Sequence, residues 1–281
     1  MATFPLLLAP LDLLTHLDQP NLRIIDLSRE SVFQQVHLRG AVWLNARRLM
    51  HGAEPVAAGL PELETLTLLM AELGITPQHQ VIAYDDEGGG WASRLIWTLH
   101  RLGHHKVSLL DGGIHAWLAA GLPTEEGNSS IQPAVVHAWT LDPQPEISAD
   151  ELCASLDQGI YRIWDCRSLE EYTGDRLAAR RGGHIPSAQH YEWTRAMDRS
   201  NALRLRPLDQ IRQELTECGI LGDPLLPTIT YPIVTYCQSH HRSSLTYVVG
   251  KILGLPIQAY AGGWSEWGNR SDTPIQTGEP T

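Results

Sequence analysis

The sequence predicts an α/β fold that occurs twice in tandem, each copy being a small parallel sheet flanked by helices. Short apolar runs alternate with longer helical patterns, which is typical of βαβ units. The two halves share an ordered set of matching segments. A length of 281 residues is also comfortable for two domains. We expect an N-terminal non-catalytic domain at 1–127, a linker at 128–146 and a C-terminal catalytic domain at 147–281.

The alternation is clearest in the first half. An apolar run at 81–83 predicts a strand, and residues 92–102 carry apolar side chains at helical spacing. A second strand is predicted at 106–110 and a helix at 114–120, after a Gly-Gly turn. A strand, helix, strand and helix in succession indicate a parallel sheet, in which sites lie at the carboxyl ends of strands.

The repeat rests on four matches that keep their order along the chain. They pair Ile24-Ile25-Asp26 with Ile163-Trp164-Asp165, His37-Leu38 with His184-Ile185, Val81-Ile82-Ala83-Tyr84-Asp85 with Ile233-Val234-Thr235-Tyr236-Cys237, and Asp111-Gly112-Gly113 with Ala261-Gly262-Gly263. Each pair is separated by about 150 residues, so two copies of one domain is the natural interpretation. The segment 123–145 is rich in Pro, Gly, Asn, Ser and Gln, which is typical of an interdomain connection.

Composition narrows the function classes. The net charge of −11 argues against a general nucleic-acid surface. Few cysteines in a large chain suit a reducing compartment, and no stretch approaches the length needed to cross a membrane, so we expect a cytoplasmic protein. The apolar opening at 4–8 has no preceding basic residue and is interrupted by Pro10 and Asp12, so it predicts the entry to a first helix instead of a signal peptide.

Cys237 is the candidate nucleophile. It ends the apolar run 233–236, and a helical pattern follows Ser243, so the cysteine opens a tight strand-to-helix loop. Successive amides and the positive end of a helix favour an anion at the sulfur. Arg242 adds positive charge, so the thiol should ionise below its ordinary pKa and act as an accessible thiolate nucleophile.

These residues resemble the rhodanese family of sulfurtransferases, in particular its two-domain type. Phe33-x-x-x-His37-Leu38-x-Gly40-Ala41 follows the family's first signature, with Arg39 where Pro is usual, and Tyr260-Ala261-Gly262-Gly263-Trp264-Ser265-Glu266-Trp267 follows its carboxy-terminal signature. The resemblance implies a reactive cysteine in the second copy alone, with Asp85 in its place in the first. It also implies a site in the cleft between the copies.

The loop sequence separates alternatives within the family. Cys-Gln-Ser-His-His-Arg-Ser looks like a bacterial rhodanese loop, whereas mercaptopyruvate-type enzymes resemble one another in a Cys-Gly-Ser/Ala-Gly-Val-Thr loop. Both mercaptopyruvate-type and vertebrate thiosulfate enzymes also place an Arg before an early aromatic residue of the second domain, where this chain has Glu171 before Tyr172. Four residues separate Cys237 from Arg242, one fewer than in tyrosine phosphatases, so the anion cradle is expected to suit one sulfur atom.

The function that the resemblance implies is a thiosulfate:cyanide sulfurtransferase with a persulfide on Cys237. Thiosulfate is the expected donor and cyanide or a thiol the acceptor, without cofactor or metal, since no CxxC pair is present. We expect the loop to cradle the persulfide and Arg242 to receive the donor's sulfonate, while the two histidines add charge at acid pH. The loop residues are Gln238, Ser239, His240, His241, Arg242 and Ser243. A 3-mercaptopyruvate sulfurtransferase, a persulfide carrier that serves a protein acceptor and, last, a phosphatase or arsenate reductase stay open; a monomer is expected.

Other reactive-looking residues have structural interpretations. Cys153, Cys166 and Cys218 are expected to be small buried hydrophobes. Asp26 and Asp165 are expected to anchor loops, and His37 and His184 to be structural turn residues. The arginine pairs 47–48 and 180–181 are expected to be solvated. Trp193 is a candidate wall of the site, although core packing is favoured, and residues 88–90 are expected to form the first copy's inactive loop.

Overall fold

The computed structural model describes residues 4–52, 58–129, 131–222 and 231–280. It divides the chain into two compact units. The first unit contains Met1–Met50, Pro61–Asp142 and Met197–Leu205, and the second contains His51–Leu60, Pro143–Ala196 and Arg206–Thr281. The main division, after Asp142, falls inside the predicted linker. Two short segments, His51–Leu60 and Met197–Leu205, belong to the unit opposite to the one that their sequence position predicts. The predicted domain bounds remain a proposal.

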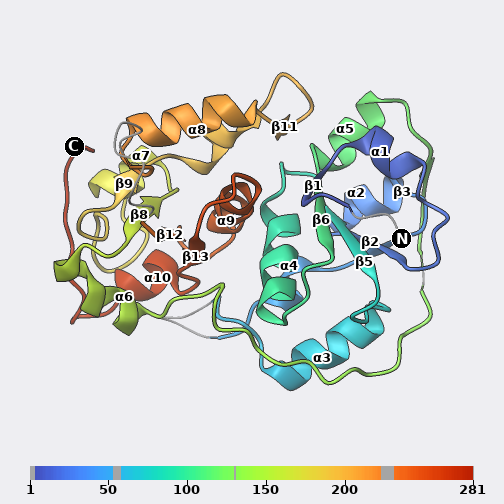
Figure 1. The fold of residues 1–281 in the computed structure, drawn as a ribbon, viewed down its shortest axis with the longest axis horizontal. Coiled ribbons are helices and arrows are strands. Elements are labelled where there is room, and N and C mark those ends of the chain that lie inside the picture. The colour runs from blue at the N-terminus through green and yellow to red at the C-terminus, as the bar shows by residue number, and fades with distance from the viewer. Residues whose placement is uncertain (1–3, 53–57, 130, 223–230, 281) are drawn as a thin grey trace. The chain divides into compact units, whose positions relative to one another are not determined.

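The first unit is built on a five-stranded parallel sheet in the order β1-β6-β5-β2-β4 (Figure 1). Its strands are β1 (Leu7–Leu8), β2 (Leu22–Asp26), β4 (Ala41–Trp43), β5 (Gln80–Tyr84) and β6 (Val107–Leu110), with β3 (His37–Leu38) pairing antiparallel with β7 (Thr124–Glu125). Its helices are α1 (Pro10–Leu14), α2 (Glu30–Gln35), η1 (Ala46–Leu49), α3 (Leu63–Glu72), α4 (Gly90–Arg101) and α5 (Gly113–Ala119). The hairpin β10 (Met197–Asp198) and β11 (Arg204–Leu205) also belongs to this unit.

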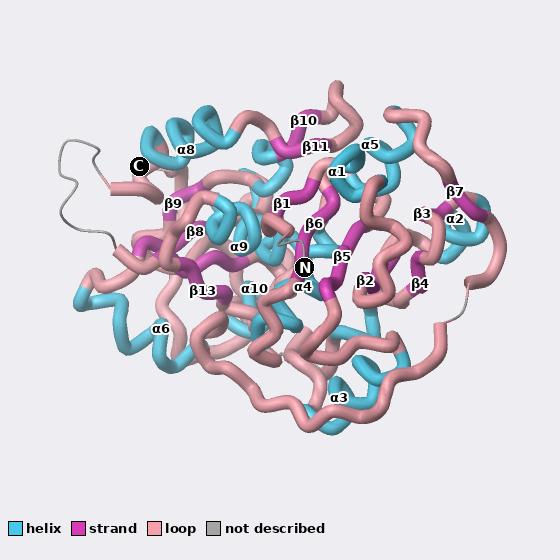
Figure 2. Tube along the Cα trace, turned by 45° about the vertical axis from the view of Figure 1, so that its right-hand side comes forward, coloured by secondary structure: helices cyan, strands magenta, loops and turns pink. Residues whose placement is uncertain are grey.

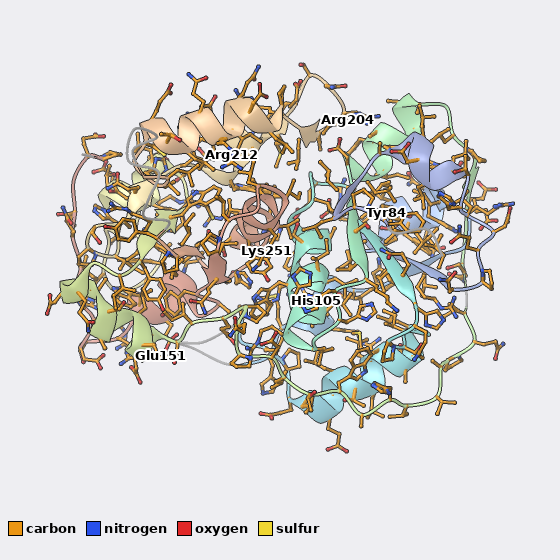
Figure 3. All side chains as sticks on the ribbon, viewed as in Figure 1. Tyr84, His105, Glu151, Arg204, Arg212 and Lys251 are labelled. Atoms are coloured by element: carbon orange, nitrogen blue, oxygen red, sulfur yellow. The ribbon has the colours of Figure 1, made fainter. Side chains whose placement is uncertain are left out.

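The central strand β5 is buried along its whole length, because helices cover both faces of the sheet. On one face, α1, α2 and α5 contribute Leu13, Phe33 and Trp117 to a core with the strands. α4 packs against β5 and β6 on the other face. Tyr84, which Figure 3 labels on β5, accepts a hydrogen bond at its hydroxyl from the Leu38 amide at 3.0 Å.

The second unit repeats this plan on a four-stranded parallel sheet in the order β13-β12-β8-β9, whose strands are magenta in Figure 2. Its strands are β8 (Arg162–Asp165), β9 (Gln189–His190), β12 (Ile233–Tyr236) and β13 (Ile257–Ala259). Its helices are α6 (Ala149–Ser155), η2 (Leu156–Gln158), α7 (Leu169–Thr173), η3 (Trp193–Ala196), α8 (Leu208–Glu217), α9 (Arg242–Ile252) and α10 (Gly263–Trp267). α6, α7 and α10 share one core with the strands, and α9 packs against β12 and β13.

The two units repeat individual contacts as well as topology. The Ile185 amide donates to the Tyr236 hydroxyl at 3.2 Å, as the Leu38 amide does to that of Tyr84. Both of the histidines predicted to be structural are buried, and each bonds through Nδ1 to a main-chain oxygen at 2.8 Å. Their rings stack on Phe33 in the first unit and Tyr172 in the second. These shared contacts confirm the tandem repeat.

The predicted strands and helices of the first half are present within two residues of their expected bounds. The opening of the chain differs from prediction, because Leu7 and Leu8 form an edge strand and the helix begins only at Pro10. Proline suits the first turn of a helix, where no donor is lost. No described helix is long and apolar enough to cross a membrane.

Candidate active site

The candidate site lies at the carboxyl end of β12 in the second unit. β12 ends at Tyr236, Cys237 follows, and α9 begins at Arg242, so the sequence-predicted strand, loop and helix are present. Helix α10 is hydrogen-bonded to the loop, since the amides of Trp264 and Ser265 donate to the carbonyls of Cys237 and Gln238 at 2.8 and 2.9 Å. The cysteine therefore occupies a fixed position next to a helix N-terminus, which favours an anion.

The Cys237 side chain is buried, contrary to the expectation of an exposed thiol. Only 1 % of the residue is accessible, and His240 and Ser243 are fully buried beside it. Gln238, Ser239, His241 and Arg242 are half-buried and form the outer part of the loop. The Ser243 hydroxyl, in the first turn of α9, is one of the groups that lie against the sulfur. A donor therefore meets the outer loop residues before it reaches the sulfur.

A chain of hydrogen bonds leads to the Cys237 sulfur. The Ser243 hydroxyl donates to Sγ at 3.4 Å, and His240 Nδ1 lies 2.8 Å from the Ser243 Oγ. Since the hydroxyl has a single proton, His240 Nδ1 is the donor in the second bond. His240 adopts a left-handed backbone conformation with φ of 52°, which is uncommon for a residue with a side chain. The Ser244 hydroxyl holds this turn by donating to the His240 carbonyl at 2.5 Å.

Cys237 favours the thiolate. Burial alone would raise the pKa of its thiol, but several neighbours bring that pKa well below the ordinary value. They are the adjacent Cys166 thiol, the positive charge of Arg242, and the hydroxyl and amide of Ser243. Burial and the adjacent Cys237 conversely raise the pKa of Cys166, so Cys166 is the protonated thiol of the pair, and it donates to the Tyr236 carbonyl at 3.2 Å. The predicted activation of Cys237 thus has a second thiol among its causes.

Arg242 does not have a free guanidinium group. Its Nη1 and Nη2 donate to the two carboxylate oxygens of Glu171, at 2.6 and 2.9 Å, in a bidentate ion pair. Burial would raise the pKa of Glu171, but the bonds and charge of Arg242 lower it to about 2. Reception of the donor's sulfonate by Arg242 stays a prediction, and two of the guanidinium N–H groups are already bonded to Glu171. The charge of Arg242 also lowers the pKa of Cys237.

A second ion pair fixes the edge of the sheet beside the loop. Asp165, at the end of β8, accepts the Arg167 amide at 3.0 Å, as expected for a loop anchor. It also forms a buried salt bridge with the Arg167 guanidinium, whose Nη2 lies 2.6 Å away, and accepts the Tyr236 hydroxyl. The equivalent Asp26 of the first unit anchors the Ser28 amide at 2.7 Å. The predicted anchoring role of both aspartates is confirmed.

The first unit contains an equivalent loop, whose amides bind the carboxylate of its own first residue. Asp85 follows β5 as Cys237 follows β12, and α4 begins five residues later at Gly90. The Asp85 carboxylate is buried and accepts the amides of Glu87, Gly89 and Ala92 at 3.0, 2.8 and 3.0 Å. This backbone therefore directs its amides at an anion on its first residue, as predicted for the loop of the second unit.

Trp193 and Gln238 border the loop. The Trp193 ring lies over that of His241, with centroids 5.7 Å apart, so the tryptophan contacts a loop residue. Gln238 Nε2 donates to the Ala178 carbonyl at 2.7 Å. Arg181 is not solvated as predicted, because its guanidinium binds main-chain oxygens of Trp267 and Thr273 at 3.0 and 2.9 Å. Among the described residues, no group of three His, Cys, Asp or Glu side chains is placed to hold a metal ion.

A model of the rhodanese-like domain matches the chain twice, at residues 9–120 and 148–270. The chain belongs to the rhodanese family. Both tandem copies are therefore rhodanese domains, and the predicted fold class is confirmed.

Full-length relatives support a sulfurtransferase of the two-domain rhodanese type. A thiosulfate sulfurtransferase of Azotobacter vinelandii is 41 % identical over 276 residues, which cover 98 % of each chain. A thiosulfate sulfurtransferase of Pseudomonas aeruginosa is 38 % identical over 97 % of each chain. The crystal structure of a 3-mercaptopyruvate sulfotransferase of Escherichia coli superposes with a TM-score of 0.79, at 24 % identity, and covers 94 % of this chain and all of that one. At this identity the superposition shows the rhodanese fold alone.

Sequence reasoning missed two members of the rhodanese site. Cys166 was expected to be inert packing, and Glu171 was noted as the absence of an arginine, not as the partner of Arg242. The internal repeat did contain a signal for Cys166, because this residue directly follows the segment that matches Ile24-Ile25-Asp26. Cys166 therefore lies at the end of β8, the strand next to β12. The Arg242–Glu171 pair joins positions 71 residues apart, and no local pattern indicates it.

Proposed function

We propose that this rhodanese transfers the sulfane sulfur of thiosulfate to a thiophilic acceptor through a persulfide on Cys237. The thiolate attacks the outer sulfur of thiosulfate, a sulfur–sulfur bond forms at Sγ, and sulfite leaves with the electron pair of the broken bond. Cyanide then takes the outer sulfur as thiocyanate and restores the thiolate. Two half-reactions on one nucleophile predict ping-pong kinetics.

The observation that carries this proposal is the position of Cys237 between the end of β12 and the N-terminus of α9, with the Ser243 hydroxyl 3.4 Å from its sulfur. These neighbours lower the pKa of its thiol. The loop of the first unit supports the proposal, because the amides there bind the charge of Asp85. We infer that the equivalent amides of the second unit, with Ser243, stabilise the terminal sulfur of the persulfide. The names of the two full-length relatives agree with thiosulfate as the donor.

The direct test is thiocyanate formation from thiosulfate and cyanide. Cys237→Ala is expected to abolish turnover, and mass spectrometry of the wild type after thiosulfate should show one sulfur gained on the peptide that contains Cys237. Cys218→Ala is the matched control, because Cys218 lies at the end of α8 and its thiol bonds to the Leu215 carbonyl. Turnover in the Cys237 variant would refute the assignment.

A 3-mercaptopyruvate donor is the second candidate, and the fold shared with the Escherichia coli enzyme permits it. The ion pair between Arg242 and Glu171 disfavours it, because a keto-acid carboxylate would have to compete with Glu171 for the guanidinium. A higher kcat/KM for mercaptopyruvate than for thiosulfate would reverse this preference. Faster transfer of the persulfide to a protein than to cyanide would instead favour a sulfur carrier.

We further propose that the chain works as a monomer in the cytoplasm. All four cysteines are free thiols, which suits a reducing compartment. Light scattering on the purified protein tests the monomer, and fractionation of the source cells tests the location. A stable dimer at working concentration would contradict the first, and recovery outside the cytoplasm would contradict the second.

A further inference from the structure

Cys166 and Cys237 leave neighbouring parallel strands at the same level. β8 and β12 are in register up to the pair Asp165 and Tyr236, and each cysteine is the next residue of its strand. The strands are still joined at this point, because the Cys166 amide donates to the Tyr236 carbonyl at 3.1 Å. Neighbouring strands lie about 4.8 Å apart, which is within the Cα separation that a disulfide spans.

The side chains converge as well as the backbones. The Cys166 thiol donates to the Tyr236 carbonyl oxygen at 3.2 Å, and this oxygen belongs to the peptide group that joins Tyr236 to Cys237. The thiol is also close enough to act on the charge of the Cys237 sulfur. Both residues are buried, with 0 % and 1 % of their surface exposed. Cys153 and Cys218 are only partly buried and lie on α6 and at the end of α8. Cys166 is therefore the thiol placed to react with any electrophilic form of Cys237.

We propose that Cys166 is a resolving cysteine, which converts an oxidised Cys237 into a Cys166–Cys237 disulfide and so makes the site a dithiol that consumes hydroperoxides. The oxidant is a small hydroperoxide, and the reductant that restores the pair is a dithiol. Hydrogen peroxide is smaller than thiosulfate, so it can follow the route that the proposed function already requires. The inference depends on that function only for this access.

Each step balances in atoms and electrons. The Cys237 thiolate attacks one peroxide oxygen, the oxygen–oxygen bond breaks, and a sulfenic acid and hydroxide result, the sulfur being oxidised by two electrons. The Cys166 sulfur then attacks the sulfenic sulfur, the sulfur–oxygen bond breaks, and the thiol proton leaves with the hydroxyl group as water. A dithiol reductant exchanges with the disulfide and leaves as its own disulfide.

The charge on Cys237 determines whether Cys166 reacts with it, and this protects the persulfide intermediate of sulfur transfer from attack by Cys166. While Cys237 is anionic, its charge contributes to the raised pKa of Cys166 and keeps that thiol protonated and weakly nucleophilic. A persulfide anion preserves negative charge next to Cys166, whereas a sulfenic acid is neutral and removes it. Cys166 is thus expected to react with the damaged cysteine and not with the productive persulfide.

The first unit shows that the fold does not need a thiol at this position. Leu27 follows β2 there, and its amide donates to the Tyr84 carbonyl at 2.8 Å, as the Cys166 amide does to that of Tyr236. Its neighbour across the strands is Asp85, which peroxide does not oxidise. A thiol therefore stands beside the thiol nucleophile, and an apolar side chain stands beside the carboxylate.

The test is thiol mapping of the reduced full-length chain after at least two equivalents of hydrogen peroxide, because the first oxidises a thiolate to the sulfenic acid and the second would oxidise an unresolved sulfenic acid to the sulfinic acid. We expect a peptide pair joined through Cys166 and Cys237, and full recovery of free thiols with dithiothreitol. Cys166→Ala and Cys166→Ser should instead give irreversible sulfinic acid on Cys237, with recovery reduced roughly tenfold or more because the intramolecular partner is lost. Cys218→Ala should behave as wild type.

Sulfinic acid on wild-type Cys237 with Cys166 still free would overturn the inference, and so would a disulfide from Cys237 to Cys153 or Cys218. The mapping uses no thiosulfate, so its outcome is separable from the proposed function. A disulfide without thiocyanate formation would leave this inference standing and remove sulfur transfer. Thiocyanate formation without the disulfide would do the reverse.

Discussion

At the scale of single residues, the site depends on how the neighbours of Cys237 share its charge. The Ser243 hydroxyl, the Cys166 thiol and the Arg242 guanidinium all act on one sulfur, and the Ser243 hydroxyl reaches it by a hydrogen bond. Hydrogen bonds to a charged group contribute about 1.5–3 kcal/mol each. The buried location strengthens these interactions because water does not screen them.

Removal of the Ser243 hydroxyl should therefore move the titration of Cys237. In Ser243→Ala we expect the pKa of Cys237 to rise by about one unit or more, because the thiolate loses a donor while the thiol does not. The absorbance of the thiolate in the ultraviolet measures this directly. The acid limb of the kcat/KM profile should shift to higher pH by the same amount. Ser200→Ala, in the exposed turn after β10, should leave the titration unchanged; an unshifted Ser243 variant would contradict the hydrogen-bond argument.

The ion pair of Glu171 leads to a second prediction, which concerns the free energy of unfolding. Its pKa falls from 4.5 to about 2 on folding, so its ion pair stabilises the protein above about pH 4.5 and loses this contribution as the pH falls toward 2. Glu171→Gln should lower the free energy of unfolding by about 3 kcal/mol at pH 7, and the difference from wild type should narrow in acid. Denaturant titrations at several pH values measure it.

Glu72→Gln is the matched control for Glu171, since Glu72 also forms a bidentate pair, with Arg48, but on the surface. Exposed pairs contribute about 0–1 kcal/mol, so this variant should differ little from wild type. Equal losses in the two variants would show that burial is not what makes the Glu171 pair strong.

At the scale of elements, one tight contact joins the loop to helix α10. Gly263, with φ of +57°, leads into this helix, and a Cβ built there would lie 2.6 Å from the Cys237 carbonyl oxygen. The first unit repeats the contact, because a Cβ on Gly113 would lie 2.2 Å from the Asp85 carbonyl oxygen. The glycine in the Gly-Gly turn thus allows helix and loop to approach until the Trp264 amide bonds to Cys237.

Gly263→Ala should therefore disturb the site more than a change of backbone preference alone. We expect a loss of about 2 kcal/mol or more in unfolding free energy, together with lower sulfur-transfer activity, because the loop carbonyl has to move. Gly254→Ala has a similar φ of +73° but no atom within 4 Å of the new Cβ, so it should cost about 1 kcal/mol and leave activity unchanged. Equal effects in both variants would remove the packing argument.

The elements were predictable where their pattern is long. The apolar run of β5 and the apolar residues at helical spacing in α4 gave both elements within two residues, because a continuous apolar run and a period of three to four residues are distinct patterns. Two-residue strands such as β1 and β9 carry no such pattern. The proximity of Cys166 to Cys237 depends on the register of β8 with β12, which is a matter of tertiary structure, so the sequence indicated the candidate nucleophile but not the thiol beside it.

At the scale of the whole chain, one fold occurs twice, and the two copies carry different side chains around the loop after the central strand. Helix α4 begins with Gly90 where α9 begins with Arg242, and Leu27 takes the place of Cys166. The first unit thus keeps the amides of the loop but lacks the thiol donor and the guanidinium that act on Cys237. In the first unit the backbone amides bind the Asp85 carboxylate, and we propose that the side chains around Cys237 add reactivity in the second.

Placing a cysteine in the first loop should consequently fail to create a second site. In the double variant Cys237→Ala/Asp85→Cys we expect no persulfide after thiosulfate and no thiocyanate formation, because the new thiol lacks the neighbours that lower its pKa. Mass spectrometry and the cyanide assay read out the two steps. Asp85→Cys alone should still form a persulfide on Cys237. A persulfide on residue 85 would show that the backbone loop alone is enough to activate a cysteine.

The carboxylate of Asp85 has a further consequence for inhibition. Because the Asp85 carboxylate already accepts the amides of Glu87, Gly89 and Ala92, these amides are not available to bind an oxyanion from solution. Sulfate or sulfite should therefore compete with the donor at a single class of binding position per polypeptide. A plot of inhibition against oxyanion concentration is expected to be hyperbolic, with a Hill coefficient of one, even though the chain carries the same loop architecture twice.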